Sequence, residues 1–259
     1  MSEPAAHDLR TAVILAAGLG TRLASQHSES PKGFLMIDGK AIVEESVDKL
    51  AAAGIERIII VTGHLSEYYE KLAASRMGPR TGARRGLIET VHNPDYAKSG
   101  SMYSLYCARH LLSSDFLLLE SDLVYEKRAL EVLLRGEEVD AVLMSGPTHA
   151  GDEVFIEAPR GMLQQMSKNP DELESIAGEL VGICRISASL YKLMCDLAER
   201  EFDHTLHVAY DTDGLVAAGA ERSIHCPLVA DLLWGEIDDE RHMKRVRERI
   251  HPAILQRDR

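Results

Sequence analysis

The first apolar segment of the chain is followed by a loop that combines small residues with an arginine, in VILAAGLGTRL at residues 13–23. Small residues let backbone N–H groups approach an anion closely. These residues are Ala16, Ala17, Gly18 and Gly20. Arg22 could grip phosphate oxygens with its forked guanidinium, and Lys32 in SPKGFL adds a mobile positive charge. The pattern indicates a phosphate-binding loop, and the alternative is an ordinary strand-to-helix turn with an exposed arginine.

Two pairs of acidic residues could supply oxygen ligands to a metal ion. Glu120 and Asp122 end the apolar run FLLLESD, where strand alternation places them on one face. Glu236 and Asp238 in WGEIDDE share a face in the same way if that segment is extended. Phosphoryl transfer requires charge on phosphate oxygens to be neutralised, and hard oxygen ligands separated in sequence suit Mg²⁺. We therefore expect Asp122 and Asp238, with Glu236, to bind Mg²⁺; a solvated loop with a helix N-cap is the alternative for WGEIDDE.

Short apolar runs typical of buried strands alternate with amphipathic stretches typical of helices, and these elements must position the acids and the loop. The expected strands are at 12–17, 57–63, 87–92, 116–122 and 141–146. The expected helices are at 41–54, 66–76, 101–112 and 127–136. This alternation predicts a mostly parallel sheet covered by helices, with ligands at the carboxyl ends of the strands.

The pattern changes after about Gly151, where strands are no longer followed regularly by helices. The expected elements are a hairpin at 153–169, a strand at 178–187, a helix at 189–201 and a basic amphipathic helix at 239–255. No proline- or glycine-rich linker separates the halves, so we expect a single domain over 1–259. The basic C-terminal helix could pack on its own core or against a second subunit, which leaves a homodimer open.

Composition restricts the environment and the partners. The net charge of −12 over 259 residues disfavours a nucleic-acid or anionic-membrane surface. The longest apolar run is far shorter than the ~20 residues of a membrane helix, which predicts no membrane insertion. Glu3 and Asp8 precede it, where a signal peptide would be cationic. The four cysteines are scattered without a C-x-x-C pair, which suits a reducing cytoplasm.

The joint pattern A-A-G-x-G-T-R-L, followed nine residues later by P-K, resembles the signature of nucleotidyltransferases that make activated sugars and alcohols. A dinucleotide fingerprint does not fit, because Leu23 occupies the position of its third glycine. The resemblance implies a three-layer α/β/α, GT-A-like or Rossmann-like fold with a mostly parallel mixed sheet. It also implies Mg²⁺-dependent attack of a phosphorylated substrate on the α-phosphate of an NTP, with release of pyrophosphate.

Less generic stretches, among them NPDYAKSGSMYSLY, SGPTHAGDEVFIEA and EIDDERH, are similar to 2-aminoethylphosphonate cytidylyltransferases over roughly 12–254. Phosphocholine cytidylyltransferases share the loop and the paired acids. The resemblance implies a reaction of CTP with 2-aminoethylphosphonate that gives CMP-2-aminoethylphosphonate for phosphonate decoration of lipids or glycans. It makes 11–150 the nucleotide-binding half, and 151–259 the half that binds the acceptor and completes the metal site.

The resemblance also implies roles for individual residues. The residues expected to line the nucleotide are Leu15, Ala16, Ala17 and Gly18. Those expected at its cytosine base are Gly63, Ser101 and Met102. Contacts to its phosphates are expected from Gly20, Thr21 and Arg22. Lys32 is expected to reach the α-phosphate and the incoming phosphonate oxygen. Arg22 and Lys168 are expected to act with it as clamps on phosphate charge.

The amine of the acceptor requires a carboxylate, a carbonyl or an aromatic face. The residues available for it are Asp152, Glu153, Tyr210 and Asp211. Trp234 is the only tryptophan of the chain, and an aromatic cage for a trimethylammonium favours tryptophan. This favours 2-aminoethylphosphonate over phosphocholine. Where the family is expected to have Tyr-Glu, the chain has Tyr210-Asp211, one methylene shorter.

Two other functions stay open. A GT-A glycosyltransferase would favour a D-x-D metal motif, which the E-S-D at 120–122 matches less well. A nucleotide-sensing protein without catalysis would be expected to lose Lys32, Asp122 or Asp238, and all three are present.

Overall fold

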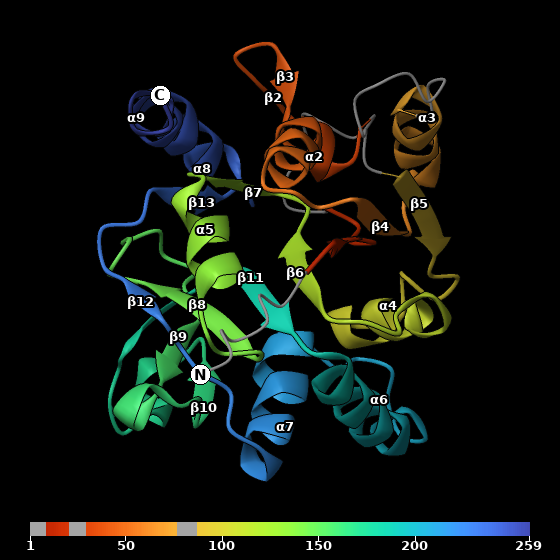
Figure 1. Ribbon diagram of the computed structural model, residues 1–259, viewed down its shortest axis with the longest axis vertical. Helices are drawn as coiled ribbons and strands as arrows, with labels where there is room; N and C mark the ends of the chain where they lie inside the picture. Colours follow the sequence, from red (N-terminus) through yellow and green to blue (C-terminus); the bar gives the residue numbers. More distant parts are fainter. Residues whose placement is uncertain (1–8, 21–29, 77–86) are drawn as a thin grey trace, which may run out of the picture.

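The computed structural model describes residues 9–20, 30–76 and 87–259. Within these residues, nine strands form one mixed sheet, in which β8 and β12 branch from a path ordered β10-β9-β11-β6-β1-β4-β5 (Figure 1). The strands are β1 (Thr11–Ala16), β4 (Arg57–Thr62), β5 (Leu87–His92), β6 (Phe116–Glu120), β8 (Ala141–Ser145), β9 (Phe155–Glu157), β10 (Gln165–Ser167), β11 (Gly178–Ile186) and β12 (Leu228–Val229). Neighbours among β6, β1, β4 and β5 pair in parallel, while β11 runs antiparallel to β6, β8 and β9. The predicted α/β fold with a mostly parallel mixed sheet is confirmed.

Helices cover both faces of this sheet, which gives three layers (Figure 1). On one face lie α2 (Ile42–Ala52), α3 (Ser66–Arg76) and α5 (Arg128–Arg135). On the other lie α4 (Ser101–Cys107), α6 (Ala188–Phe202) and α7 (Val216–Glu221). The alternation of β1 sets the two cores, because Ile14 packs with α2 while Val13 and Leu15 pack with α4.

Two short ladders and a C-terminal helical segment complete the chain. The ladders are β2 (Met36–Ile37) with β3 (Lys40–Ala41), and β7 (Leu123–Tyr125) with β13 (Trp234–Glu236). The C-terminal segment consists of α8 (Glu240–Arg245), a π-helical turn (Val246–Ile250) and α9 (His251–Arg257). Its apolar residues Met243, Val246 and Ile254 are buried in a third core, so this basic helix packs on its own chain.

The expected helix at 101–112 is shorter in the structure. It ends at Cys107 and is followed by a 3₁₀ turn, Arg109–Leu111, in which Leu111 N–H donates to the Ala108 carbonyl at 2.9 Å. The predicted hairpin is present, since β9 and β10 pair antiparallel around the turn Pro159–Gly161. A further 3₁₀ turn, Pro170–Glu172, follows β10, and another, Lys32–Phe34, follows the phosphate-binding loop.

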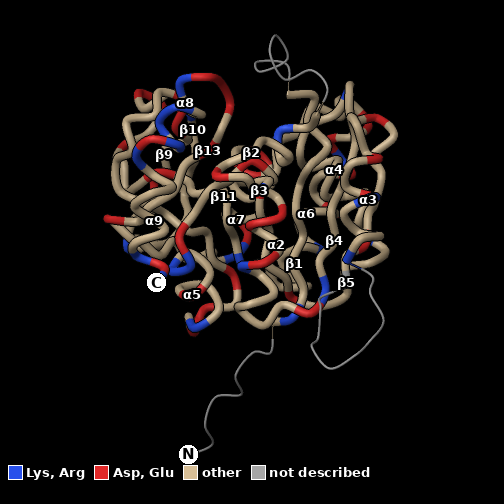
Figure 2. The backbone as a smooth tube through the Cα atoms, turned by 90° about the horizontal axis from the view of Figure 1, so that it is seen from above, with Lys and Arg blue, Asp and Glu red and all other residues tan. Residues whose placement is uncertain are grey.

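Elements from both sequence halves share the sheet. Seen from above, α8, β9, β10 and β13 lie on one side, and α3, α4, β4 and β5 lie on the other (Figure 2). Along the described part of the chain, no helix is long and apolar enough to span a bilayer.

A register shift in β11 shapes the centre of the sheet. Gly182 lies in this irregularity with φ of 77°, a conformation that side chains other than glycine's rarely adopt. A Cβ there would lie 3.1 Å from Leu123 Cδ1 and 3.5 Å from the Glu120 carboxyl carbon. Only a glycine therefore fits without strain at this point beside Glu120.

We expect Gly182→Ala to lower the free energy of unfolding by about 1–2 kcal/mol, because a left-handed alanine is strained. Gly219→Ala is the matched control. Gly219 lies within α7, and a Cβ added there would be at an ordinary van der Waals distance of 3.5 Å from the Leu163 side chain. Alanine there should be neutral or stabilising by up to ~1 kcal/mol. Urea unfolding of both variants measures the difference, and equal free energies would contradict this account of β11.

Candidate active site

A cavity opens at the carboxyl ends of β1 and β6, where the sequence places the phosphate-binding loop. Predicted residues that line it are Leu15, Ala16, Ala17, Gly18, Gly20, Lys32 and Ser101. Ser101 is the first residue of α4, and its Oγ accepts a hydrogen bond of 2.9 Å from Tyr210 N–H. Met102 is fully buried in the core below, and it is not among the described residues that line this cavity. Thr21 and Arg22 lie outside the described residues.

Tyr96 is a lining residue that sequence reasoning missed. It stands in a turn held by Asn93, whose side-chain oxygen accepts from Asp95 N–H at 2.9 Å. Gly63, at the end of β4, is packed so closely that a Cβ would lie 2.5 Å from Tyr96 Cβ and 2.6 Å from the Ala17 carbonyl oxygen. Gly63 thus allows Tyr96 to approach the loop, which is a constraint that no local pattern reveals.

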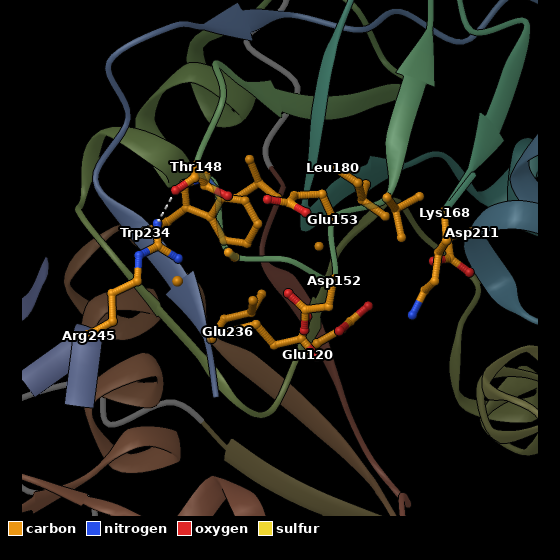
Figure 3. A pocket seen from close by; sticks show the side chains of 16 residues that line it. Glu120, Thr148, Asp152, Glu153, Lys168, Leu180, Asp211, Trp234, Glu236 and Arg245 are labelled. Carbon is orange, nitrogen blue, oxygen red and sulfur yellow. Dashed lines mark hydrogen bonds between the residues drawn. The ribbon is translucent and has the colours of Figure 1, made fainter. Parts of the chain in front are cut away.

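A second cavity adjoins the first and is rich in carboxylates (Figure 3). Predicted residues that line it are Asp152, Glu153, Lys168, Asp211 and Glu236. Glu120 and Asp211 line both cavities, so the two spaces share a wall. Lys168 and Asp211 lie next to each other in the close view (Figure 3). Burial raises the pKa of Asp211, whereas the charge of Lys168 acts to lower it.

The β7–β13 ladder brings the two predicted acidic segments together. Leu123 pairs with Glu236, and Ile237 N–H donates to the Asp122 carbonyl oxygen at 3.2 Å. As a result, one carboxylate oxygen from each of Glu120, Asp122 and Glu236 lies within 4.8 Å of the others. Asp122 and Glu236, two of the three expected metal ligands, belong to this group together with Glu120, whereas Asp238 is not in it.

Asp238 lies beside this group and is joined to it through Lys32. Lys32 Nζ donates to Asp122 Oδ2 at 3.1 Å and forms a second ion pair with Asp238. The helix N-cap offered as the alternative for WGEIDDE is present at Asp239, whose side chain accepts from His242 N–H at 2.8 Å. Asp238, the residue before this cap, is buried.

Mutual repulsion and burial dominate the electrostatics of this carboxylate group. Burial raises the pKa of Glu236 to about 10, and the charges of Asp122 and Glu120 act in the same direction. Burial, followed by the charges of Asp122 and Asp211, raises the pKa of Glu120 to about 8. Tyr210 opposes this rise, since its hydroxyl donates to Glu120 at 2.7 Å.

Lys32 carries the compensating charge. Burial acts to lower the pKa of Lys32, but the charges of Asp122 and Asp238 outweigh burial and hold that pKa above its ordinary value. One lysine cannot balance four converging carboxylates. A divalent cation would lower their repulsion, and three hard oxygen donors within 4.8 Å fit Mg²⁺.

Trp234 lines the second cavity. Its Nε1–H donates to Ser145 Oγ at 2.8 Å, and this bond fixes the indole among the lining residues. Among the described lining residues of this cavity, Trp234 is the aromatic side chain, and acidic groups outnumber it. The arrangement can bind a primary ammonium through charged hydrogen bonds.

Comparison with known proteins yields a consistent set of matches. Residues 12–255 match the family model described as the MobA-like NTP transferase domain. The chain is 32% identical over 255 residues to the CMP-5'-(3-aminopropyl)phosphonate synthase of Streptomyces rubellomurinus, covering 93% of this chain but only 39% of that protein. It is 27% identical to the 2-aminoethylphosphonate cytidylyltransferase of Lancefieldella rimae, covering 83% of each. The solved inositol-1-phosphate CTP transferase from T. maritima superposes with a TM-score of 0.80 at 18% identity, covering 96% of each chain, which supports the fold.

The raised carboxyl pKa values predict a pH dependence of stability. Between the ordinary carboxyl pKa and the raised folded values, the folded state binds more protons than the unfolded chain, so its stability falls as pH rises. Without divalent ions, the free energy of unfolding should fall more steeply in the wild type than in Glu236→Gln. The slopes of unfolding free energy against pH should differ between the two proteins by up to ~1.4 kcal/mol per pH unit between about pH 5 and pH 8. Denaturant unfolding of both proteins across this pH range tests the prediction, and parallel pH profiles would refute it. Excess Mg²⁺ should bring the two profiles closer together.

Proposed function

Since the chain belongs to the MobA-like NTP transferase family, we propose that it transfers CMP from CTP to 2-aminoethylphosphonate and releases pyrophosphate. The observation that carries this proposal is the pair of adjoining cavities, one beside the glycine-rich loop and one lined by carboxylates. The names of the two relatives, which act on aminoalkylphosphonates, support the same acceptor class.

The first cavity is assigned to CTP. Its backbone at Ala16, Ala17 and Gly18 is open to close approach by phosphate oxygens, and a Cβ at Gly18 would meet nothing within 4 Å. Glu120, Asp122 and Glu236, with Asp238 beside them, would hold Mg²⁺, which neutralises charge on phosphate oxygens. Ser101 and Tyr96 would bound the nucleoside.

Lys32 is assigned the central electrostatic role in the transfer. It stands at the first cavity with its ammonium already fixed by Asp122 and Asp238, so little reorganisation is needed when negative charge develops nearby. A phosphonate oxygen is anionic near neutral pH, so the attack requires no general base. Arg22 and Lys168 would add charge around the phosphates.

The second cavity is assigned to the acceptor. Asp211 and Glu153 offer carboxylates to its ammonium, and Asp211 also borders the CTP cavity. A trimethylammonium donates no hydrogen bonds and would instead require several aromatic faces. Phosphocholine is therefore the less suitable alternative, whereas phosphoethanolamine shares the primary ammonium. The product would serve phosphonate decoration of lipids or glycans, and the four free cysteines agree with a cytoplasmic location.

Pyrophosphate release with CTP and Mg²⁺ tests the proposed reaction across a panel of acceptors. We expect kcat/KM to be highest for 2-aminoethylphosphonate or its three-carbon homologue. It should be at least ~10-fold lower for ethylphosphonate, which lacks the charged hydrogen bonds of the amine.

Preferred turnover of phosphocholine in this panel would overturn the acceptor assignment. Binding of CTP without turnover of any acceptor would favour a nucleotide sensor. Transfer of a sugar from a nucleotide sugar would favour a GT-A glycosyltransferase.

The variants Asp122→Asn and Lys32→Ala should each lower kcat by at least ~100-fold. The first removes a proposed Mg²⁺ ligand, and the second removes a positive charge that faces the reacting phosphates. Lys192→Ala is the control, since Lys192 lies on α6 and pairs only with exposed Asp196 among the contacts described. Steady-state rates, with circular dichroism as a check of folding, measure the effect. A near-normal rate in either site variant would remove that residue from the mechanism.

A further inference from the structure

A second group of potential metal ligands lies next to the carboxylate group that the proposed reaction uses. One ligand atom from each of Asp152, Asp238 and His242 lies within 4.8 Å of the other two. The side chains of Asp238 and His242 are only 3% exposed, and that of Asp152 is 20% exposed. These ligands come from the loop that precedes β9 and from the start of α8, two segments far apart in sequence.

The hydrogen bonding of His242 leaves Nδ1 as the ring nitrogen available to a ligand, at 3.6 Å from Asp152 Oδ2 and 3.9 Å from Asp239 Oδ1. Its Nε2 lies 3.2 Å from the carbonyl oxygen of Ala150, to which it can donate its proton. Its Nδ1 then carries a lone pair, is buried, and has no hydrogen-bond partner. A metal-binding histidine commonly donates its other ring N–H to a backbone carbonyl in this way.

The distance between His242 and Asp152 fits two ligands of one ion better than a hydrogen bond. His242 Nδ1 lies 3.6 Å from Asp152 Oδ2. Two ligands that each lie about 2.1 Å from a tetrahedral ion are separated by ~3.4 Å. The observed separation is close to that value, and it is too long for a hydrogen bond.

Neighbouring contacts hold the two ligand segments in place. Arg241 Nη2 donates to the Ala150 carbonyl at 2.6 Å, and Arg245 Nη2 donates to the Thr148 carbonyl at 2.9 Å. Asp239 caps His242 N–H at 2.8 Å and so fixes the first turn of α8. The loop and the helix are therefore oriented toward each other by bonds that do not involve the three ligand atoms.

Two described cations lie close to the ligand group. Lys32 pairs with both Asp238 and Asp122. Arg241 lies nearby, with its Nη2 3.3 Å from His242 Nε2, but it faces the opposite ring nitrogen from the ligand group.

We propose that Asp152, Asp238 and His242 bind a divalent transition ion such as Zn²⁺, separate from the oxygen-only group that suits Mg²⁺. Imidazole favours such ions, whereas Mg²⁺ prefers a shell of oxygen ligands. The ion ties the loop that lines the acceptor cavity to Asp238, the carboxylate that holds Lys32. Asp152 is then a metal ligand, which leaves Glu153 and Asp211 to receive the acceptor amine.

Binding of Zn²⁺ to the full-length protein tests this site without any nucleotide or acceptor. Excess Mg²⁺ is present to compete for the oxygen-only group, and affinity is read by competition with a chromophoric chelator. We expect one tightly bound Zn²⁺, and His242→Ala should weaken it at least ~100-fold, the upper end of what losing a mere second-shell partner costs. His251→Ala is the matched control, because His251 is equally buried but its two nitrogens face different carboxylates, Asp38 at 3.2 Å and Glu45 at 3.3 Å.

Two further measurements keep the test decisive if His242→Ala fails to fold. Asp152→Asn changes a loop side chain without changing its size and should also weaken Zn²⁺ binding, whereas Asp122→Asn should retain it. In the wild type, Zn²⁺ should shift the ¹⁵N resonance of His242 Nδ1. Absence of tight Zn²⁺ binding, wild-type affinity in His242→Ala, or an unshifted His242 resonance would each overturn the proposal, whatever the outcome of the turnover assays.

Discussion

The site depends on one buried ionic arrangement, in which Lys32 contacts Asp122 and Asp238. Lys32 follows the glycine-rich loop, Asp122 follows β6, and Asp238 precedes α8 near the end of the chain. Four carboxylates converge around this ammonium. Burial strengthens the repulsion among the carboxylates and also their attraction to the Lys32 ammonium. The sheet and the β7–β13 ladder bring these distant segments together.

Local sequence patterns predicted the main strands and helices and part of this arrangement, whereas β12 and α7 went unpredicted. Alternation along FLLLESD places Glu120 and Asp122 on one face, because Glu120 ends β6 and Asp122 lies two residues later. The same reasoning paired Glu236 with Asp238, but β13 ends at Glu236 and the chain turns into α8. Glu236 therefore joins Glu120 and Asp122, while Asp238 turns toward Lys32. This separation depends on the β7–β13 ladder, which no local pattern encodes.

Contacts between distant segments explain what the sequence left unpredicted. Tyr210 was expected near the acceptor amine, and in the structure its hydroxyl donates to Glu120 while its backbone N–H donates to Ser101. Tyr210 thereby connects the first cavity, which it lines with Ser101, to the carboxylate group. Tyr96 and His242 went unnoticed because a single tyrosine or histidine has no spacing signal, and its role appears only once Gly63 or Asp152 is placed against it.

We propose that the residues lining the two adjoining cavities catalyse transfer of a CMP group to an aminoalkylphosphonate. The most direct measurement is ³¹P NMR of the protein with CTP, Mg²⁺ and 2-aminoethylphosphonate. The account predicts that the phosphonate resonance is replaced by a coupled pair from a new phosphonate–phosphate anhydride, in equal amount to the pyrophosphate formed. An unchanged phosphonate resonance, with CTP either intact or hydrolysed to CMP, would contradict it.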